Sequence, residues 1–147
     1  MIPVENMSDL DQARGLLDPP ARQQTLILLV DDDDTLRTII QMGLERLGYA
    51  VWPAANGESA LEAAAHHKEI QLLLTDVLMP GLSGVELAEQ LRKTHPRIEV
   101  LYISGHLQTT ISALNVPLDS IHFLQKPFRS IELDDRIQTI LSKRDEL

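Results

Sequence analysis

The sequence predicts an α/β fold, in which a doubly wound parallel sheet of five strands carries helices on both faces. Five apolar residues, Leu26 to Val30, run directly into four carboxylates, Asp31 to Asp34, as if a strand buried on both faces ended in charge. Further short apolar runs alternate with stretches of helical periodicity. Because open parallel sheets place ligand sites at the carboxyl ends of their strands, the acidic run indicates a site at that edge.

The amino-terminal half is expected to contain two strands and two helices. A strand over residues 25–30 is followed by a helix over residues 33–47, for which Gly48 suits the C-terminal cap. A second strand covers residues 50–54, and Asn56 is expected to cap an alanine-rich helix that reaches about residue 67. The apolar residues of the first helix recur at helical spacing: Leu36, Ile39, Ile40, Leu44 and Leu47.

The carboxyl-terminal half repeats this alternation. Strands are expected over residues 71–75, 99–103 and 121–125, and a loop rich in glycine follows the first of them. One helix stops before Pro96, a short helix is expected over residues 108–114, and Ser130 is expected to cap the last helix. The inward-facing residues of the longer helices are Leu87, Ala88 and Leu91, then Leu133, Ile137, Ile140 and Leu141.

Length, charge and composition exclude several classes of protein. The chain has 147 residues, enough for one domain, and a net charge of −9, which argues against a nucleic-acid-binding surface. It has no cysteine, and no apolar run approaches the roughly 18 residues of a membrane span. The amino terminus lacks a signal peptide pattern, so the cytoplasm is the expected location. Residues 1–24 are polar and end near a proline pair, so we expect an extension or linker before a domain over residues 25–147.

The expected strand ends bring together Asp31, Asp32, Asp76, Ser104 and Lys126. Asp31 and Asp32 alone would fit either a solvated helix start or a cation site. Three carboxylates and one ammonium, however, leave a net charge of −2, which a divalent cation would relieve. Oxygen ligands without His or Cys suit Mg²⁺ or Mn²⁺. A carboxylate beside Mg²⁺ can attack phosphorus, so the group suits phosphoryl transfer.

These motifs resemble the receiver domain of bacterial two-component response regulators. The resemblance rests on segments that occur in order at the expected strand ends: residues 30–33, 75–81, 83–84, 103–105 and 126–128. It spans about residues 25–143 and implies a flavodoxin-like, CheY-like sheet in the order 2-1-3-4-5. It also implies phosphorylation by a histidine kinase or a histidine phosphotransfer protein.

The resemblance assigns a role to each site residue. Asp76 would accept the phosphoryl group, and Asp32, Asp76 and the backbone carbonyl of Leu78 would bind Mg²⁺. Asp31 would act through a bound water, and Lys126 would pair first with Asp76 and then with the phosphoryl group. Ser104 would move to bind that group, and Phe123 would turn inward as the switch aromatic. The Lys126–Pro127 peptide bond would be cis.

The signal would leave through the face made by the short helix over residues 108–114, the strand over residues 121–125 and the last helix, toward a protein partner or a second copy. The chain would be a phosphoacceptor rather than an enzyme, and it would not itself bind nucleic acid. It could act alone, serve in a phosphorelay, or derive from a hybrid histidine kinase. Two rival functions are a receiver-like docking module that is never phosphorylated and a Mg²⁺-dependent aspartyl-phosphate phosphatase. The phosphatase usually needs a second acid at position 78, which is Leu here.

Overall fold

The computed structural model describes residues 24–105 and 121–146, and all five of its strands run parallel in one sheet. The sheet order is β2-β1-β3-β4-β5, as the resemblance implied. The expected helix at 108–114 lies outside the described residues. The strands are β1 (Leu26–Val30), β2 (Ala50–Ala54), β3 (Ile70–Asp76), β4 (Glu99–Ser104) and β5 (His122–Gln125). The helices are α3 (Asp34–Arg46), α4 (Gly57–Ala65), α5 (Gly84–Thr94) and α7 (Ser130–Glu146).

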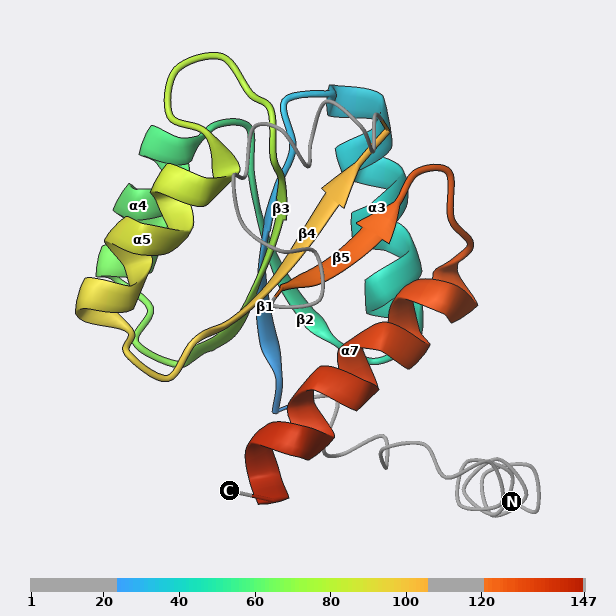
Figure 1. The fold of residues 1–147 in the computed structure, drawn as a ribbon. Coiled ribbons are helices and arrows are strands. Elements are labelled where there is room, and N and C mark those ends of the chain that lie inside the picture. The colour runs from blue at the N-terminus through green and yellow to red at the C-terminus, as the bar shows by residue number, and fades with distance from the viewer. Residues whose placement is uncertain (1–23, 106–120, 147) are drawn as a thin grey trace, which may run out of the picture.

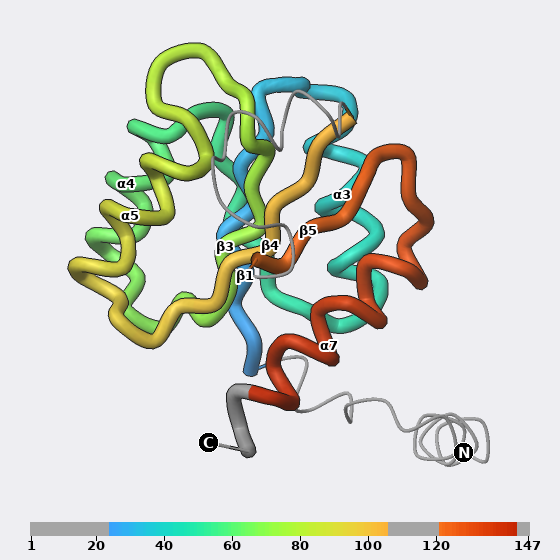
Figure 2. Tube along the Cα trace, viewed as in Figure 1, coloured from blue at the N-terminus to red at the C-terminus, as the bar shows by residue number. Residues whose placement is uncertain are grey.

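Helices cover both faces of the sheet, with α4 and α5 on one side and α3 and α7 on the other (Figures 1 and 2). The strand β1 lies between these layers and supplies side chains to both. Leu28 and Val30 pack into the core under α4 and α5, whereas Ile27 and Leu29 pack into the core under α3 and α7. All four side chains are fully buried, which explains why this strand is continuously apolar rather than alternating.

Local capping sets where three of the helices begin. Asp33 accepts from the Leu36 N–H, Asn56 from the Ser59 N–H, and Ser83 from the Glu86 N–H. The predicted cap at Asn56 is therefore confirmed, and Gly48, with a φ of 102°, follows the end of α3 as expected.

One prediction about a helix residue is wrong. The prediction that Ser130 caps the last helix fails because α7 already includes Ser130, and Glu132 instead accepts from the Arg129 N–H at 2.9 Å. Ile39 shares the apolar spacing of α3 but is 60% exposed. Its spacing places it at the edge of the apolar stripe, beyond the reach of the sheet.

The edge strand β2 contains Pro53, a residue rarely found in central strands. The Ala50 N–H donates to the Thr25 carbonyl at 3.1 Å, so alternate β2 residues direct their N–H groups toward β1. Pro53 belongs to the alternate set of residues, whose backbone nitrogens face the free edge of the sheet. The N–H that proline lacks is therefore not needed for pairing with β1. The proline therefore fits β2 and withholds a donor from strand pairing at that edge.

Parallel strands bring four chain segments to one edge of the sheet. The register pairs Val30 with Thr75, Asp76 with Ile103, and Ser104 with Gln125. The residues that follow β1 and β5 therefore lie beside the end of β3. Within the described ranges, no helix is long and apolar enough to cross a bilayer.

Candidate functional site

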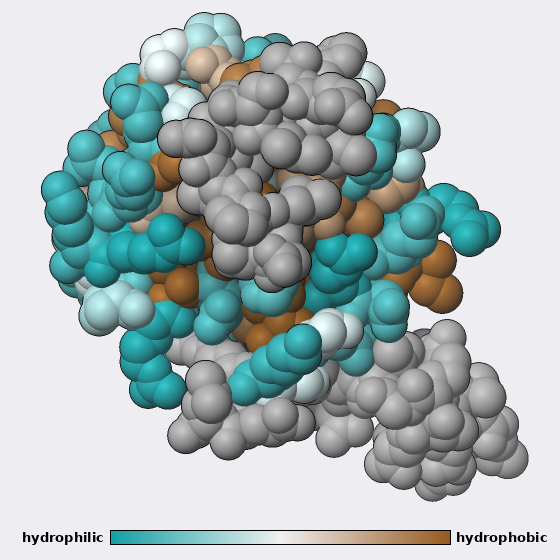
Figure 3. All heavy atoms as spheres, in the orientation of Figure 1, coloured by the Kyte–Doolittle hydropathy of each residue, from teal (hydrophilic) through white to brown (hydrophobic). Residues whose placement is uncertain are grey.

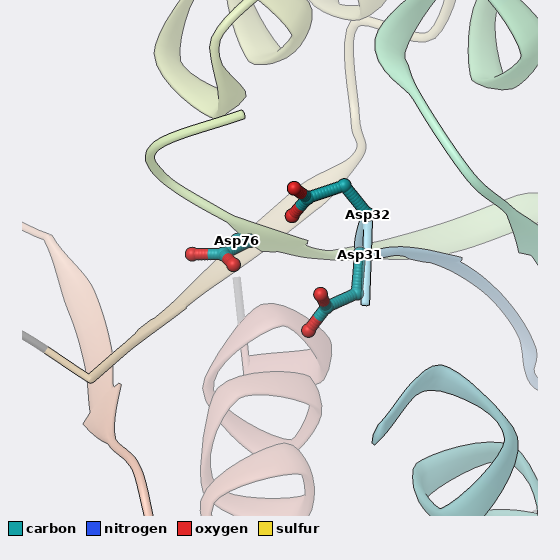
Figure 4. Close-up of side chains that lie close together, drawn as sticks. All are labelled: Asp31, Asp32 and Asp76. Atoms are coloured by element: carbon teal, nitrogen blue, oxygen red, sulfur yellow. The ribbon is translucent and has the colours of Figure 1, made fainter. Parts of the chain in front are cut away.

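Three carboxylates converge at this edge. Asp31 and Asp32 extend from the end of β1, and Asp76 is the last residue of β3 (Figure 4). Each offers one oxygen within 4.8 Å of the others. The site residues predicted to be acidic ligands are therefore brought together, although Asp76 follows Asp32 by 44 residues along the chain.

Asp31 is held from three directions and is fully buried. Its Oδ1 accepts from the Asp33 N–H at 2.9 Å, and its Oδ2 accepts from Lys126 Nζ at 3.0 Å. Its backbone carbonyl accepts from Arg37 Nη1 at 2.7 Å. Asp32, by contrast, is exposed, so the turn fixes one carboxylate as an internal anchor and presents the next to solvent.

Lys126 links the two strand ends, because its Nζ also lies 3.1 Å from Asp76 Oδ2. Burial raises the pKa of Asp76 above its ordinary value, although Lys126 opposes this shift. For Lys126, burial lowers the pKa, but hydrogen bonding and attraction from Asp31 and Asp76 outweigh it, and the net shift is upward. Lys126 therefore stays protonated, while Asp76 carries a charge that its surroundings do not fully stabilise.

The donor set fits a hard divalent cation. The acidic ligands supply only oxygen, and the single ammonium leaves a net charge of −2 among the four side chains. Mg²⁺ typically takes one or two carboxylates and keeps several waters, and the exposure of Asp32 leaves room for them. The residues present therefore fit Mg²⁺, or Mn²⁺ with the same ligands.

The other predicted site residues lie around this cluster. Ser104 ends β4 and is buried, and its carbonyl accepts from the Lys126 N–H at 2.8 Å. Leu78 follows β3 with its side chain partly exposed. Phe123 lies on β5, is partly buried, and packs against the core under α4 and α5, while Arg136 donates to its carbonyl. The Lys126–Pro127 peptide bond is cis.

Two residues contact the site that were not assigned to it from sequence. Arg37 binds the Asp31 carbonyl, and Gly84 packs against the backbone of Asp76 so closely that a Cβ there would lie 2.2 Å from the Asp76 carbonyl oxygen. Arg37 stands out in the sequence as the nearest positive charge to the acidic run. The Ser83–Gly84 pair formed part of the family resemblance, but its residue types indicated only a loop, because a close approach between backbones leaves no sequence signal.

The predicted output face includes the helix expected over residues 108–114, which lies outside the described residues; its other two elements are β5 and α7. Most of the described surface in Figure 3 is hydrophilic, but hydrophobic atoms show at the right, beside the start of α7. Ile131 on α7 and Ile39 and Met42 on α3 are exposed apolar side chains. A pocket of about 210 Å³ beside Lys126 is lined by Leu36, Ile39, Ile40, Lys126, Pro127, Phe128, Ser130 and Leu133.

Comparison with known proteins identifies the family. Residues 27–138 match the response regulator receiver domain. The chain is 37% identical over 121 residues to the sensor kinase CckA of Brucella abortus, a match that covers 81% of this chain and 13% of that protein. It is 34% identical over 116 residues to the response regulator receiver protein CpdR of the same organism, covering 78% of this chain and 95% of that protein.

Solved structures of receiver domains have the same fold as this chain. The receiver domain of the hybrid histidine kinase CckA superposes with a TM-score of 0.67 at 34% identity, covering 79% of this chain and 98% of that domain. A response regulator receiver protein from Sinorhizobium medicae gives a TM-score of 0.71 at 28% identity, covering 82% and 96%. The chain spans about half of other curated relatives, such as the PhoP regulator of Bacillus subtilis, of which it covers 49%. The chain belongs to the response regulator receiver domain family of two-component signal transduction.

Proposed function

We propose that this chain is a phosphoacceptor, in which Asp76 takes a phosphoryl group from a phosphohistidine in a Mg²⁺-dependent reaction. The observation that carries the proposal is the joint placement of three carboxylates within 4.8 Å and of Lys126 Nζ at 3.1 Å from Asp76. Asp32, Asp76 and the backbone carbonyl of Leu78 would hold the ion, and Asp31 would contact it through water. The domain would cover residues 25–147, with residues 1–24 as an extension or linker.

The transfer follows from the positions of these groups. One carboxylate oxygen of Asp76 attacks phosphorus as the bond from phosphorus to the histidine nitrogen breaks, and that nitrogen keeps the bonding pair. The products are an aspartyl phosphate and a neutral imidazole, whose proton is already on the other ring nitrogen of the donor or comes from water. Lys126 already forms an ion pair with Asp76 and is placed to bind a phosphoryl oxygen. When bound, Mg²⁺ supplies further positive charge to the phosphoryl oxygens.

Phosphorylation would then act as a two-state switch. The new group adds negative charge at the end of β3, and the Ser104 hydroxyl would turn to bind it. Phe123 lies on the neighbouring strand, so it would follow into space that Ser104 vacates and change the surface of β5 and α7. A protein partner, or a second copy, would bind that surface together with the helix expected over residues 108–114. By linkage, its binding would also favour phosphorylation.

The proposal also names the donor of the phosphoryl group and the kind of protein to which the chain belongs. The chain would receive a phosphoryl group from a histidine kinase or a histidine phosphotransfer protein in the cytoplasm, and it would not be an enzyme in its own right. Its similarity to part of a sensor kinase supports an origin in a hybrid kinase, and its similarity to CpdR supports a free-standing receiver. A phosphatase is disfavoured because position 78 carries an apolar side chain instead of a second acid.

Intact-mass spectrometry after incubation with MgCl₂ and acetyl phosphate tests the proposal. We expect one added phosphoryl group, which should be absent with EDTA and absent in Asp76→Asn. Asp34→Asn is the matched control, because this acid lies in the same run but is 85% exposed and bonds Arg37 through its Oδ1. Addition of phosphate to Asp76→Asn, or no addition to the wild type under any condition, would overturn the proposal and favour an unphosphorylated docking module.

A further inference from the structure

Arg37 reaches back from α3 to the acidic turn. Its Nη1 donates to the carbonyl oxygen of Asp31 at 2.7 Å, and its Nη2 donates to Asp34 Oδ1 at the same distance. The two ends of this contact differ in setting. The side chain of Arg37 is only 18% exposed and that of Asp34 is 85% exposed, so the arm on the Asp31 carbonyl is the sheltered one.

The bonded carbonyl belongs to the peptide unit that joins Asp31 to Asp32. The orientation of that peptide sets the direction in which the Asp32 side chain leaves the backbone. Asp31 is already fixed by its bonds to Lys126 and to the Asp33 N–H, whereas the exposed Asp32 side chain makes no such bond to the part of the chain that the structure describes. The contact from Arg37 therefore constrains the backbone beside Asp32, the exposed ligand.

We infer that Arg37 is a positioning residue for the magnesium site, holding the Asp31–Asp32 peptide so that the Asp32 carboxylate faces Asp76. This inference rests on the proposed function and adds a residue that acts through the ligands rather than on the ion. Partners that orient metal ligands in this way typically change metal affinity by about 10-fold to 100-fold when they are lost. A planar guanidinium binds two acceptors at once, which a lysine ammonium cannot reproduce with the same geometry.

The charge of Arg37 would act in the opposite direction. A cation near three carboxylates repels Mg²⁺, so its removal should tighten binding if charge were its main contribution. Loss of positioning should weaken binding instead. The sign of the change in affinity therefore separates the two roles, and a lysine substitution separates them again because it keeps the charge.

Isothermal titration calorimetry with MgCl₂ measures this directly, without any phosphodonor. We expect Arg37→Met to raise the Mg²⁺ dissociation constant about 10-fold and Arg37→Lys to raise it several-fold, at an unchanged folded fraction by circular dichroism. Asp34→Asn, which alters only the exposed arm, should stay within about 2-fold of the wild type. A purely structural role would lower the melting temperature in EDTA but leave the dissociation constant unchanged.

Three results would overturn the inference. Arg37→Met could bind Mg²⁺ as tightly as the wild type or more tightly, Arg37→Lys could restore wild-type affinity fully, or Asp34→Asn could weaken binding as much as Arg37→Met. Should Arg37→Met fail to fold, Arg37→Lys decides the matter by the same comparison. Absence of Mg²⁺ binding by the wild type would instead overturn the magnesium part of the proposed function, and the inference with it.

Discussion

Replacing Gly84 with alanine should damage both the fold and the site, because the start of α5 packs directly on the backbone that carries Asp76. A Cβ at this position would lie 2.2 Å from the Asp76 carbonyl oxygen and 3.1 Å from Val77 Cα, whereas real Cβ contacts essentially never fall below 3.0 Å. The Gly84 N–H also donates to the Val77 carbonyl at 2.9 Å, which ties the two segments together. The backbone must therefore separate by nearly 1 Å.

The size of the effect follows from two opposing contributions. Overpacking of this kind costs about 1–3 kcal/mol, and the obstacle here is backbone that cannot rotate away. Alanine gains up to about 1 kcal/mol over glycine within a helix, but less at the first helical residue. We expect the free energy of unfolding to fall by about 2 kcal/mol, which corresponds to a melting temperature lower by about 5–10 °C.

Urea denaturation, followed by calorimetric titration of Mg²⁺ into the folded variant, would measure both consequences. Gly105→Ala is the matched control, since no heavy atom of the described residues lies within 4 Å of a Cβ placed there, and its stability should change by less than about 0.5 kcal/mol. The reasoning would be refuted if Gly84→Ala unfolded with wild-type free energy and bound Mg²⁺ with wild-type affinity.

Three further predictions follow from the charges and caps. Because burial raises the pKa of Asp76, its charge opposes folding at neutral pH, so Asp76→Asn should melt a few degrees above the wild type in EDTA and gain less from added Mg²⁺ by differential scanning calorimetry. In urea denaturation, Ser83→Ala should lower the free energy of unfolding by about 1 kcal/mol, because it removes the cap on α5. Glu86→Gln should lower it by much less, and equal losses in the two variants would contradict this prediction. Burial lowers the pKa of His122 below 6.5, so the unfolded chain binds the proton more readily and stability should fall as pH drops below 6.5. His122→Gln should reduce that pH dependence, and an unchanged slope between pH 7.5 and 5.5 would count against it.

The sequence was most informative where apolar runs were long and ended sharply. The first strand and its acidic end were predicted within one residue, because a continuous run from Leu26 to Val30 followed by charge has few other interpretations. The sheet order, in contrast, came from the resemblance, since the alternation of strands and helices does not state which strands are neighbours. The observed order places the carboxyl ends of β3 and β5 at one edge of the sheet, where Asp76 and Lys126 meet.

What the sequence could not predict depends on the exact geometry of helix starts, helix faces and turns. Ser130 has the chemistry of a helix cap, but the chain enters α7 one residue earlier than that interpretation required. Ile39 follows the helical spacing, yet α3 is turned so that this residue faces solvent. The contact of Arg37 with the Asp31 carbonyl is local in sequence, but it depends on how the turn folds, and no pattern of residue types specifies that geometry.

The central claim is that Asp76 itself carries the phosphoryl group. The most direct measurement is to phosphorylate the chain with acetyl phosphate and MgCl₂, reduce the acyl phosphate with borohydride, and locate the product by tandem mass spectrometry. Reduction converts an aspartyl phosphate to homoserine at the modified position. We predict homoserine at position 76 and unmodified residues at Asp31 and Asp32. Homoserine at either of those positions, or a stable phosphate on a serine or histidine instead, would contradict the account.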